Sequence, residues 1–457
     1  MIVRIRPPLD IEKMTRVLAH APGQEAITEF ENTFAGRVGA CGAIAVDRGR
    51  AALLMALKIL NLKPGDEVIV QSFIFHAVID AILETGAKPV LADSRLEDFN
   101  IDPESIESMI TAKTKAVIAT HLGVPCDMDE ISWIARKHNC CLIENCAHTL
   151  GAEYNKAPVG RFGSMSFYSF DVDKPVSTGD GGMLLINDPG LLKRAQSIRE
   201  SYRKVPLEKE EEIVCGLILH YLATGEDFYP RNGFLPVDYG KQAVKKDKFL
   251  LSMIKDAVRG DVKTQFRKCI WPYMQKKQMC GHNKSSEDSI FSRIIGHARM
   301  FLWNPKIPRI DHHYLLMNSL RSSVGAECQR DYGLYKAKRD QNAQYYSDHL
   351  KTSIFKNPVI SNGKKPAFIR YCVLNESGYA NPKIKAAALS EGLELGIFNW
   401  SAPAHLCYPY NKLLDFDRSR LQRSEQLGKK LFSLPIHPYI SHESLEKITA
   451  FMNQFAN

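Results

Sequence analysis

Short apolar runs alternate with helical patterns along the first two hundred residues. Glu67–Gln71, Cys141–Asn145 and Met165–Ser169 are largely apolar over about five positions, as is typical of buried strands. Segments such as Ala51–Leu60 and Met128–His138 have the apolar spacing of helices. The remaining predicted strands are Pro89–Asp93, Ala116–Thr120 and Gly182–Ile186, and the remaining predicted helices are 24–39, Ala77–Thr85 and Pro103–Ile110. This alternation predicts an α/β fold, with a mostly parallel sheet and helices on both faces.

The regular alternation ends in the segment 201–308, which has helical spacing only in places such as Lys241–Arg259. Residues 201–300 hold 18 lysines and arginines against 12 aspartates and glutamates, a large part of the net charge of +9. A solvated helical surface is one interpretation, and a surface for an anionic substrate is the other. No zinc-finger spacing, basic zipper or aromatic-basic RNA motif occurs. We therefore expect neither a nucleic-acid partner nor a bound metal.

The last part of the chain follows a different pattern. A long helix is predicted over Leu315–Leu350, and a strand over Phe368–Val373 lies in a mixed segment that ends in a helix. This pattern predicts a small C-terminal α+β domain over 351–457. The large domain is then expected to cover 1–350, with the segment 201–308 inside it.

Composition narrows the class of protein. Hydrophobic residues make up 45% of the 457 residues and charged residues 24%, which are ordinary globular values. No apolar run approaches the roughly 18 residues that cross a bilayer, and the first residues lack the apolar core of a secretory signal. The eleven cysteines have no framework spacing, which suits a reducing compartment. We therefore expect a cytoplasmic protein without a membrane span.

A polar stretch, Asp47–Ala52, opens one of the predicted helices. Its glycine at position 49 permits a tight turn, and the free N–H groups of a helix start bind phosphate through hydrogen bonds and the helix dipole. Arg50 would add a charge-assisted contact. The alternative interpretation is a glycine that only caps the helix.

Two further polar segments follow predicted strands. Ser169–Lys174 places a lysine on a loop before a glycine-rich stretch, Gly179–Gly182. A lysine that apolar sequence removes from water becomes a nucleophile, although most loop lysines are solvated. Ile143–His148 ends the preceding strand, and His148 is expected either to face the same crevice or to be a hydrogen-bonded core histidine.

Together these segments resemble the DegT/StrS-type sugar aminotransferases, which use pyridoxal phosphate (PLP) on the fold-type I aminotransferase scaffold. The resemblance covers about 24–200 and resumes at 315–350 and 385–450. It is carried by ungapped matches in the same order: Lys63-Pro-Gly-Asp-Glu-Val68, Gly86-Ala-Lys-Pro-Val90, Asn100-Ile-Asp102, Thr114-Lys-Ala116, Ser169-Phe170 with Lys174, Gly181-Gly182 and Ser433-Leu-Pro-Ile-His-Pro438. The resemblance implies a PLP cofactor and a homodimer, because sites of this fold are usually completed by a second subunit.

The resemblance also implies roles for the matching residues around the cofactor phosphate. Lys174 would form the Schiff base with PLP and later transfer the proton. Ser169 would bind the phosphate group of the cofactor. Gly49, Arg50 and Ala51 fall on the family's phosphate loop, where Arg50 replaces a threonine.

The pyridine ring and the substrate would meet a second set of residues. Phe75 would stack on the ring, and His148 would act beside its 3'-oxygen. His405, in the stretch Pro403-Ala-His405, would lie near the substrate. Asn145 stands where the family has an aspartate that keeps the ring nitrogen protonated. A neutral amide supplies no such charge, so the resemblance implies PLP binding more firmly than it implies transamination.

We therefore expect an aminotransferase that moves an amino group from an amino acid, such as glutamate, to a keto-sugar or related keto substrate. Two alternatives remain. One is a PLP enzyme of another reaction type, such as elimination, dehydration or oxidation, owing to Asn145. The other is a non-catalytic protein that keeps the fold. The segment 201–308 is longer than in the family, and the run 312–317 lacks the asparagine that family members supply to a partner subunit.

Overall fold

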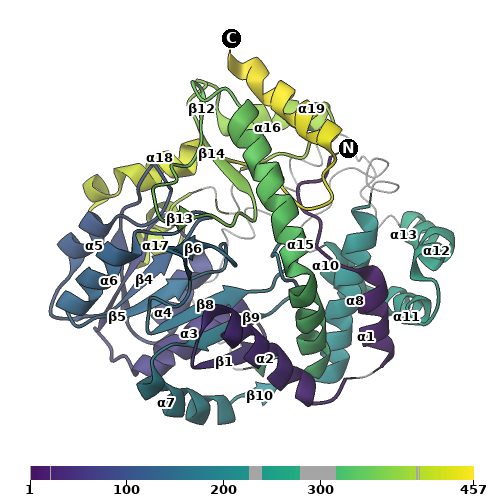
Figure 1. Ribbon diagram of the computed structural model, residues 1–457, viewed down its shortest axis with the longest axis horizontal. Coiled ribbons are helices and arrows are strands. Elements are labelled where there is room, and N and C mark those ends of the chain that lie inside the picture. The colour runs from purple at the N-terminus through teal and green to yellow at the C-terminus, as the bar shows by residue number, and fades with distance from the viewer. Residues whose placement is uncertain are drawn as a thin grey trace.

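The computed structural model describes residues 2–20, 22–225, 239–277, 315–397, 400 and 402–456. A nine-stranded sheet forms its centre, in the order β10-β11-β1-β9-β8-β5-β4-β2-β3 (Figure 1). The strands of this sheet are β1 (Gly42–Val46), β2 (Glu67–Gln71), β3 (Lys88–Ala92), β4 (Thr114–Thr120), β5 (Cys141–Asn145), β8 (Met165–Ser169), β9 (Gly182–Ile186), β10 (Arg203–Lys204) and β11 (Leu315–Leu316). The six predicted strands of the alternating region are all present, within two residues at either end.

Most neighbouring strands run parallel. The pairs β3–β2, β2–β4, β4–β5 and β5–β8 are parallel, whereas β9 pairs antiparallel with both β8 and β1. The carboxyl ends of β4, β5 and β8 therefore meet at one edge, where Thr120, Asn145 and Ser169 are the last residues. This edge is where ligands bind in open α/β sheets.

Helices cover both faces of the sheet, as predicted. Successive strand residues point to opposite faces, so Ile44 and Val46 pack with α3 (Gly49–Leu60) and α4 (His76–Glu84), and Ala45 packs on the other face. That other face carries α1 (Ile11–Ala19), α2 (Glu25–Val38), α5 (Pro103–Met109), α6 (Met128–Lys137), α8 (Leu207–Ala223) and the long α15 (Ser319–His349). α7 (Pro189–Glu200) lies on the α3 side. The two hydrophobic cores bury most residues of the central strands, and β2 and β9 are buried along their whole length.

The segment after residue 200 is more regular than its sequence indicated. α8 was not predicted, because Ile213–Leu219 is buried on nearly every side and so lacks amphipathic spacing. The single helix expected over Lys241–Arg259 is two helices, α10 (Tyr239–Lys246) and α11 (Lys248–Ala257), separated at Asp247. The Asp247 side chain caps α11 by accepting a hydrogen bond from the Leu250 N–H. No helix among the described residues has the length and apolar character that a bilayer crossing requires.

The helices α8 and α10 lie in close contact at two glycines. A Cβ atom on Gly216 would lie 2.9 Å from the Cα atom of Lys241, and one on Gly240 would collide with the carbonyl oxygen of Gly216. The helices α11, α12 (Val262–Gln265) and α13 (Trp271–Lys276) group at one side of the molecule (Figure 1). The contact between α8 and α10 at Gly216 and Gly240 fixes the position of α10 and therefore of Lys241.

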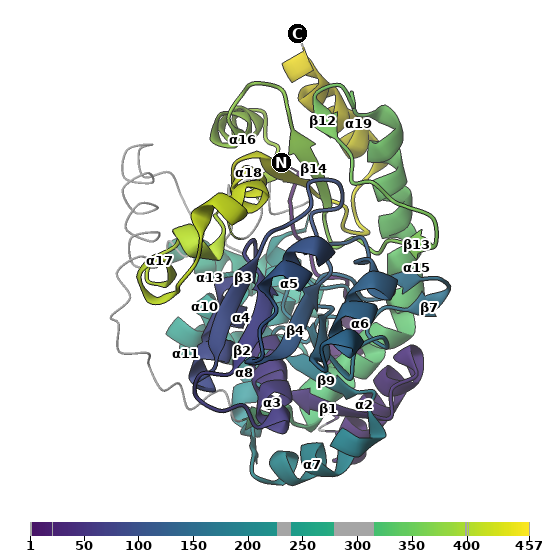
Figure 2. The same ribbon diagram turned by 90° about the vertical axis from the view of Figure 1, so that its left-hand side faces the viewer.

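A second, four-stranded sheet lies in the C-terminal part. Its order is β12-β14-β16-β15, all antiparallel, with β12 (Phe355–Lys356), β14 (Tyr371–Asn375), β16 (Leu431–Leu434) and β15 (Gly396–Ile397). α16 (Asn381–Ser390), α19 (His442–Asn453) and the end of α15 pack on it. Figure 2 shows this group above the large sheet. The predicted division at residue 350 falls between α15 and β12 and stays a prediction.

Part of the C-terminal segment packs on the large sheet instead. Tyr410 and Leu414, in and after α17 (Tyr410–Leu413), belong to the hydrophobic core of α3 and α4. The Tyr410 hydroxyl donates a hydrogen bond to Asp80 of α4. Figure 2 shows α17 beside the strands and helices of the large sheet. The chain after 400 therefore returns to the edge where the strands end.

Candidate active site

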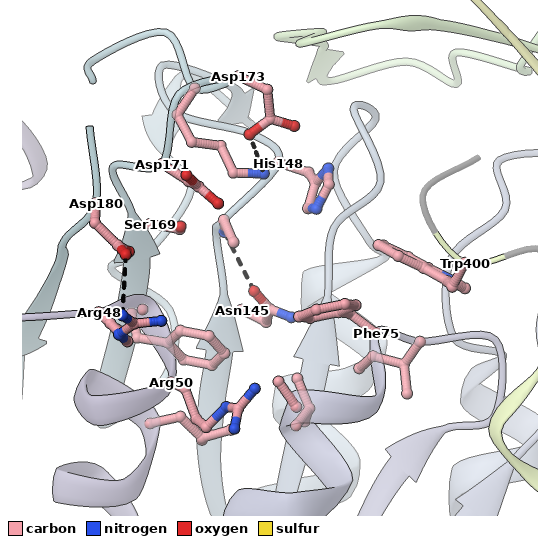
Figure 3. Close-up of a pocket in the computed structure, with 18 residues that line it drawn as sticks. Arg48, Arg50, Phe75, Asn145, His148, Ser169, Asp171, Asp173, Asp180 and Trp400 are labelled. Carbon is pink, nitrogen blue, oxygen red and sulfur yellow. Dashed lines mark hydrogen bonds and ion pairs between the residues drawn. The ribbon is translucent and has the colours of Figure 1, made fainter. Parts of the chain in front are cut away.

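A cavity of about 260 Å³ lies at the carboxyl ends of β5 and β8 and at the starts of α3 and α4 (Figure 3). Seven of the nine predicted site residues line it: Gly49, Arg50, Phe75, Asn145, His148, Ser169 and Lys174. They come from four separate stretches of sequence, and the folded sheet brings them together. Among the lining residues that were not predicted are Arg48, Asp171, Asp173, Asp180 and Trp400.

One end of the cavity has the features of an anion-binding site. The first hydrogen bond within α3 runs from the Ala52 N–H to the Arg48 carbonyl oxygen, so the N–H groups of Gly49, Arg50 and Ala51 have no carbonyl partner inside the helix. Ser169 closes on this helix start: a Cβ atom on Gly49 would lie 3.0 Å from the Ser169 Cβ and 3.3 Å from its Oγ. A side chain at position 49 would fill the space in front of the helix start. Glycine is therefore required there for close approach rather than for capping alone.

Ala51 contributes only its backbone to this end. Its side chain is fully buried in the core beneath α3 and does not line the cavity. Arg50 does line the cavity, with its Nη1 atom 4.0 Å from Asp80 Oδ2 and its side chain 25% exposed. The added cation thus stands beside the helix start that the sequence predicted to bind phosphate.

Lys174 is the buried amine of the cavity. The residue is 6% exposed and sits in the loop between β8 and β9. Hydrogen bonds from the Lys174 N–H to the Asp171 carbonyl oxygen, and from the Thr178 N–H to the Phe170 carbonyl oxygen, shape this loop. Burial lowers the pKa of Lys174, and the nearby Asp173 carboxylate opposes this shift only in part. A lysine of this kind loses its proton more readily than a surface lysine and so becomes a nucleophile.

Another wall of the cavity is formed by His148 and by the aromatic rings of Phe75 and Trp400. Burial, and then the charge of Lys174, lower the pKa of His148 well below its usual range, so its imidazole is neutral. The Trp400 ring lies edge-on to His148, with centroids 5.5 Å apart, and 6.0 Å from the Phe75 ring. Phe75 is 41% exposed although it is a large apolar side chain. An exposed aromatic face inside a cavity suits stacking against a planar ligand.

Asn145 ends β5 at the floor of the cavity, next to Phe75 (Figure 3). Its side-chain oxygen accepts a hydrogen bond from the Ala147 N–H at 3.2 Å, and its amide nitrogen donates to Thr120 Oγ1 at 3.3 Å. These two bonds fix the amide group in place. At this position the described part of the cavity wall therefore has a neutral amide group and not a carboxylate.

The carboxylates of the cavity lie instead around the lysine loop. Asp171, Asp173 and Asp180 all line it, and Arg48 Nη2 lies 3.4 Å from Asp180 Oδ2 (Figure 3). Lys241 of α10 reaches the same group, with its Nζ atom 2.8 Å from Asp171 Oδ1 and 3.7 Å from Asp180 Oδ2. The segment 201–308 therefore supplies a cation at the rim of the cavity. Its stretches 226–238 and 278–308 lie outside the described residues.

His405 has a different environment from the one predicted. It is 1% exposed and does not line the cavity. Its Nδ1 atom lies 2.7 Å from Ser72 Oγ and its Nε2 atom 3.3 Å from Glu425 Oε1, so both ring nitrogens have partners. Burial lowers its pKa. This arrangement gives the predicted substrate contact of His405 no support.

A group of possible metal ligands lies on the other face of β5. His121, Glu144 and Cys146 are buried and close together. The Glu144 carboxylate, however, already accepts hydrogen bonds from the N–H groups of Gly160, Phe162 and Gly163, and His121 Nε2 lies 3.3 Å from it. These contacts use the oxygen atoms that a metal would need. The cluster is best explained as a structural hydrogen-bond network.

The model of the DegT/DnrJ/EryC1/StrS aminotransferase family matches residues 11–216 and 313–453. The chain is 41% identical over 174 residues to GDP-perosamine synthase of Caulobacter vibrioides, covering 38% of this chain and 47% of the relative. It is 41% identical over 175 residues to dTDP-3-amino-3,6-dideoxy-alpha-D-galactopyranose transaminase of Aneurinibacillus thermoaerophilus, covering 38% and 48%. The chain thus spans about half the length of the curated relatives it matches.

A solved structure extends the likeness to the whole fold. The PLP form of Spr1654 from Streptococcus pneumoniae superimposes with a TM-score of 0.69, covering 100% of this chain and 98% of the other at 17% identity. At that identity the likeness shows the fold alone. The stretch 217–312, which the family model leaves unmatched, contains α10 and therefore Lys241.

Proposed function

Since the chain belongs to the DegT/DnrJ/EryC1/StrS aminotransferase family, we propose that it is a PLP-dependent aminotransferase. In this proposal it moves an amino group from an amino acid, with glutamate as the donor, to a keto-sugar or related keto substrate in glycan or natural-product biosynthesis. The two relatives named above carry a GDP- and a dTDP-linked sugar in their names, which supports a nucleotide-sugar substrate. One observation carries the proposal: a buried lysine and an anion-binding helix start face the same small cavity.

The residues of the cavity fit PLP. The space in front of α3, which a Cβ atom on Gly49 would fill, matches a phosphate group bound by helix N–H groups and the Ser169 hydroxyl. Phe75 offers an exposed face for the ring, and Lys174 offers the amine. A non-catalytic protein would have no need to bury this lysine in the same cavity as the helix start, so we favour an enzyme.

Bound PLP supplies an aldehyde that takes up the amino group and a ring that withdraws electrons. The chain's own residues do the rest. Lys174 holds and returns a proton at its Nζ atom, because burial lowers its pKa. Neutral His148 accepts or donates one hydrogen bond beside the ring, and Phe75 and Trp400 exclude water from it.

Asn145 favours a second candidate function. Without a carboxylate on the ring nitrogen, the cofactor withdraws electrons less strongly, so an elimination, dehydration or oxidation on PLP is the alternative to transamination. We also propose the homodimer and the cytoplasmic location that the sequence led us to expect.

The assay that tests the proposal follows the fate of the amino group. Purified full-length protein is incubated with PLP, nitrogen-15 glutamate and a panel of nucleotide-linked 3-keto and 4-keto sugars. We expect labelled nitrogen in an aminosugar product and an equal amount of 2-oxoglutarate. Release of ammonia or hydrogen peroxide without an aminosugar would reject transamination and favour the alternative.

Arg50 gives a prediction for the phosphate end. Replacing Arg50 with alanine is expected to weaken PLP binding by about 1.5–3 kcal/mol, the range for a hydrogen bond to a charged group, or roughly 10- to 150-fold in Kd. The reason is that the Arg50 side chain lines the cavity beside the start of α3. Fluorescence titration with PLP measures the change. The control is Arg259→Ala, which alters an exposed arginine two residues after the end of α11 and should leave Kd unchanged. An unchanged Kd for Arg50→Ala would show that Arg50 does not reach the phosphate.

A further inference from the structure

Asp173 lies between two buried cations. Its Oδ1 atom is 3.3 Å from Lys174 Nζ, and its Oδ2 atom accepts a hydrogen bond from the Arg370 guanidinium. The three side chains are 5%, 7% and 3% exposed, in that order. A carboxylate placed this way is held at both oxygens, so its position is fixed and so is the position of the lysine ammonium that it contacts.

Arg370 comes from a distant part of the chain. It directly precedes β14 of the four-stranded sheet, 197 residues after Asp173. The Arg370–Asp173 bond therefore connects the four-stranded sheet to the loop that carries Lys174. Asp173 also lines the cavity itself, so the bonded carboxylate faces the space that the lysine faces.

The charges around Lys174 act in opposite directions. Burial lowers its pKa most, Asp173 raises it, Arg370 lowers it and Asp171 raises it. Burial alone would raise the pKa of Asp173, but the positive charges of Lys174 and Arg370 lower it by more, so Asp173 stays ionised at neutral pH. His148 is itself neutral, because burial lowers its pKa. Asp173 is thus the nearest counter-ion of the lysine.

We propose that Asp173 and Arg370 are positioning residues for Lys174. Asp173 holds the Lys174 ammonium against the cavity wall while the amine is not bonded to a ligand. The Arg370 guanidinium bonds the other carboxylate oxygen, and its own positive charge opposes that of the ammonium. The four-stranded sheet thereby sets how reactive the lysine is. This inference rests on the proposed role of Lys174 as the reactive amine, but not on the identity of the substrate.

The test measures the pH at which Lys174 becomes nucleophilic. Full-length protein is pulsed with trace acetic anhydride between pH 6 and 12, and acetylation of the Lys174 peptide is quantified by mass spectrometry, with the exposed Lys263 as internal standard. Asp173→Asn keeps the shape and removes the negative charge, so the midpoint should fall, by about 1–3 pH units for an opposite charge at this distance. Arg370→Gln removes a positive charge, so the midpoint should rise.

The opposite signs separate this proposal from a purely structural role. Loss of packing in both variants would move the two midpoints in the same direction, and that result would overturn the proposal, as would an unchanged midpoint for Asp173→Asn. Arg370→Lys keeps the charge and should keep the parent midpoint, which provides a readout if Arg370→Gln does not fold. The control Asp256→Asn removes an exposed carboxylate in α11 and should change nothing.

The same measurement distinguishes this inference from the proposed function, because it needs neither PLP nor substrate. Unchanged midpoints in a protein that transaminates contradict the inference alone. Midpoints that move as expected, in a protein that does not transaminate, support the inference and leave only the proposed function rejected.

Discussion

Replacing Lys174 with alanine is expected to abolish the covalent attachment of PLP and to lower turnover by at least about 10²–10⁴-fold, the contribution of one positioned acid–base group. Among the described residues that line the cavity, Lys174 is the one lysine. Lys241, at the rim, is engaged with Asp171 and Asp180, and those carboxylates raise its pKa against the effect of burial, so it stays charged and is a poor nucleophile.

The measurement is borohydride reduction of protein mixed with PLP, followed by peptide mapping. Parent protein should carry the pyridoxyl group on the peptide that contains Lys174, and Lys174→Ala should carry none there. Lys263→Ala, which removes an exposed lysine, is the matched control and should behave like the parent. A pyridoxyl group on any other lysine of the parent protein would contradict the assignment. Lys174→Ala should remain folded, because it leaves the bond between Arg370 and Asp173 in place.

Replacing Asn145 with aspartate is expected to strengthen the electron-withdrawing ring. An opposite charge beside the ring nitrogen raises the pKa of that nitrogen by about 1–3 units, and each unit corresponds to roughly tenfold in the stability of the charged form. The variant should therefore hold the protonated cofactor to higher pH than the parent. The change is sterically mild, because the Ala147 N–H and the Thr120 hydroxyl can both donate to a carboxylate at this site.

Two observables follow from the Asn145→Asp variant. The absorbance of bound PLP should titrate about 1–3 pH units higher, and glutamate should convert the cofactor to pyridoxamine phosphate faster if the protein is an aminotransferase. An enzyme selected for another reaction should instead lose its native activity or form side products. Asn145→Ala adds no charge and serves as the control. Equal titration and equal rates in parent and aspartate variant would show that residue 145 does not contact the ring nitrogen.

The strands and the lysine loop could be predicted from the sequence because their signals are local. β5 was predicted to the residue, since Cys141–Asn145 is a short apolar run that ends in polar residues. α8 was missed for the opposite reason: a helix buried all round has no periodic polar face. β1, Gly42–Val46, was also missed, because it runs directly into the helix start that the motif at Asp47–Ala52 marks.

The parts of the site that escaped prediction depend on long-range contacts. Arg370 bonds to Asp173 across 197 residues, and Trp400 reaches His148 from the far end of the chain. Neither residue has a spacing or motif of its own, so only the fold reveals them. His405 shows the converse case: a motif placed it near the substrate, yet the structure pairs it with Ser72 and Glu425 in the core.

Lys241 bears on how this chain could be shortened. It comes from the stretch 217–312 that the family model leaves unmatched, yet it contacts Asp171 and Asp180 of the cavity. Deleting that stretch would remove Lys241 and leave the Asp171 and Asp180 carboxylates without the cation that contacts both of them. Electrostatic repulsion would then grow beside the cavity in which we propose that an anionic cofactor and an anionic substrate bind. The stretch 217–312 therefore contributes to the charge balance of the site. A protein that lacks it would also need neutral residues in place of Asp171 and Asp180.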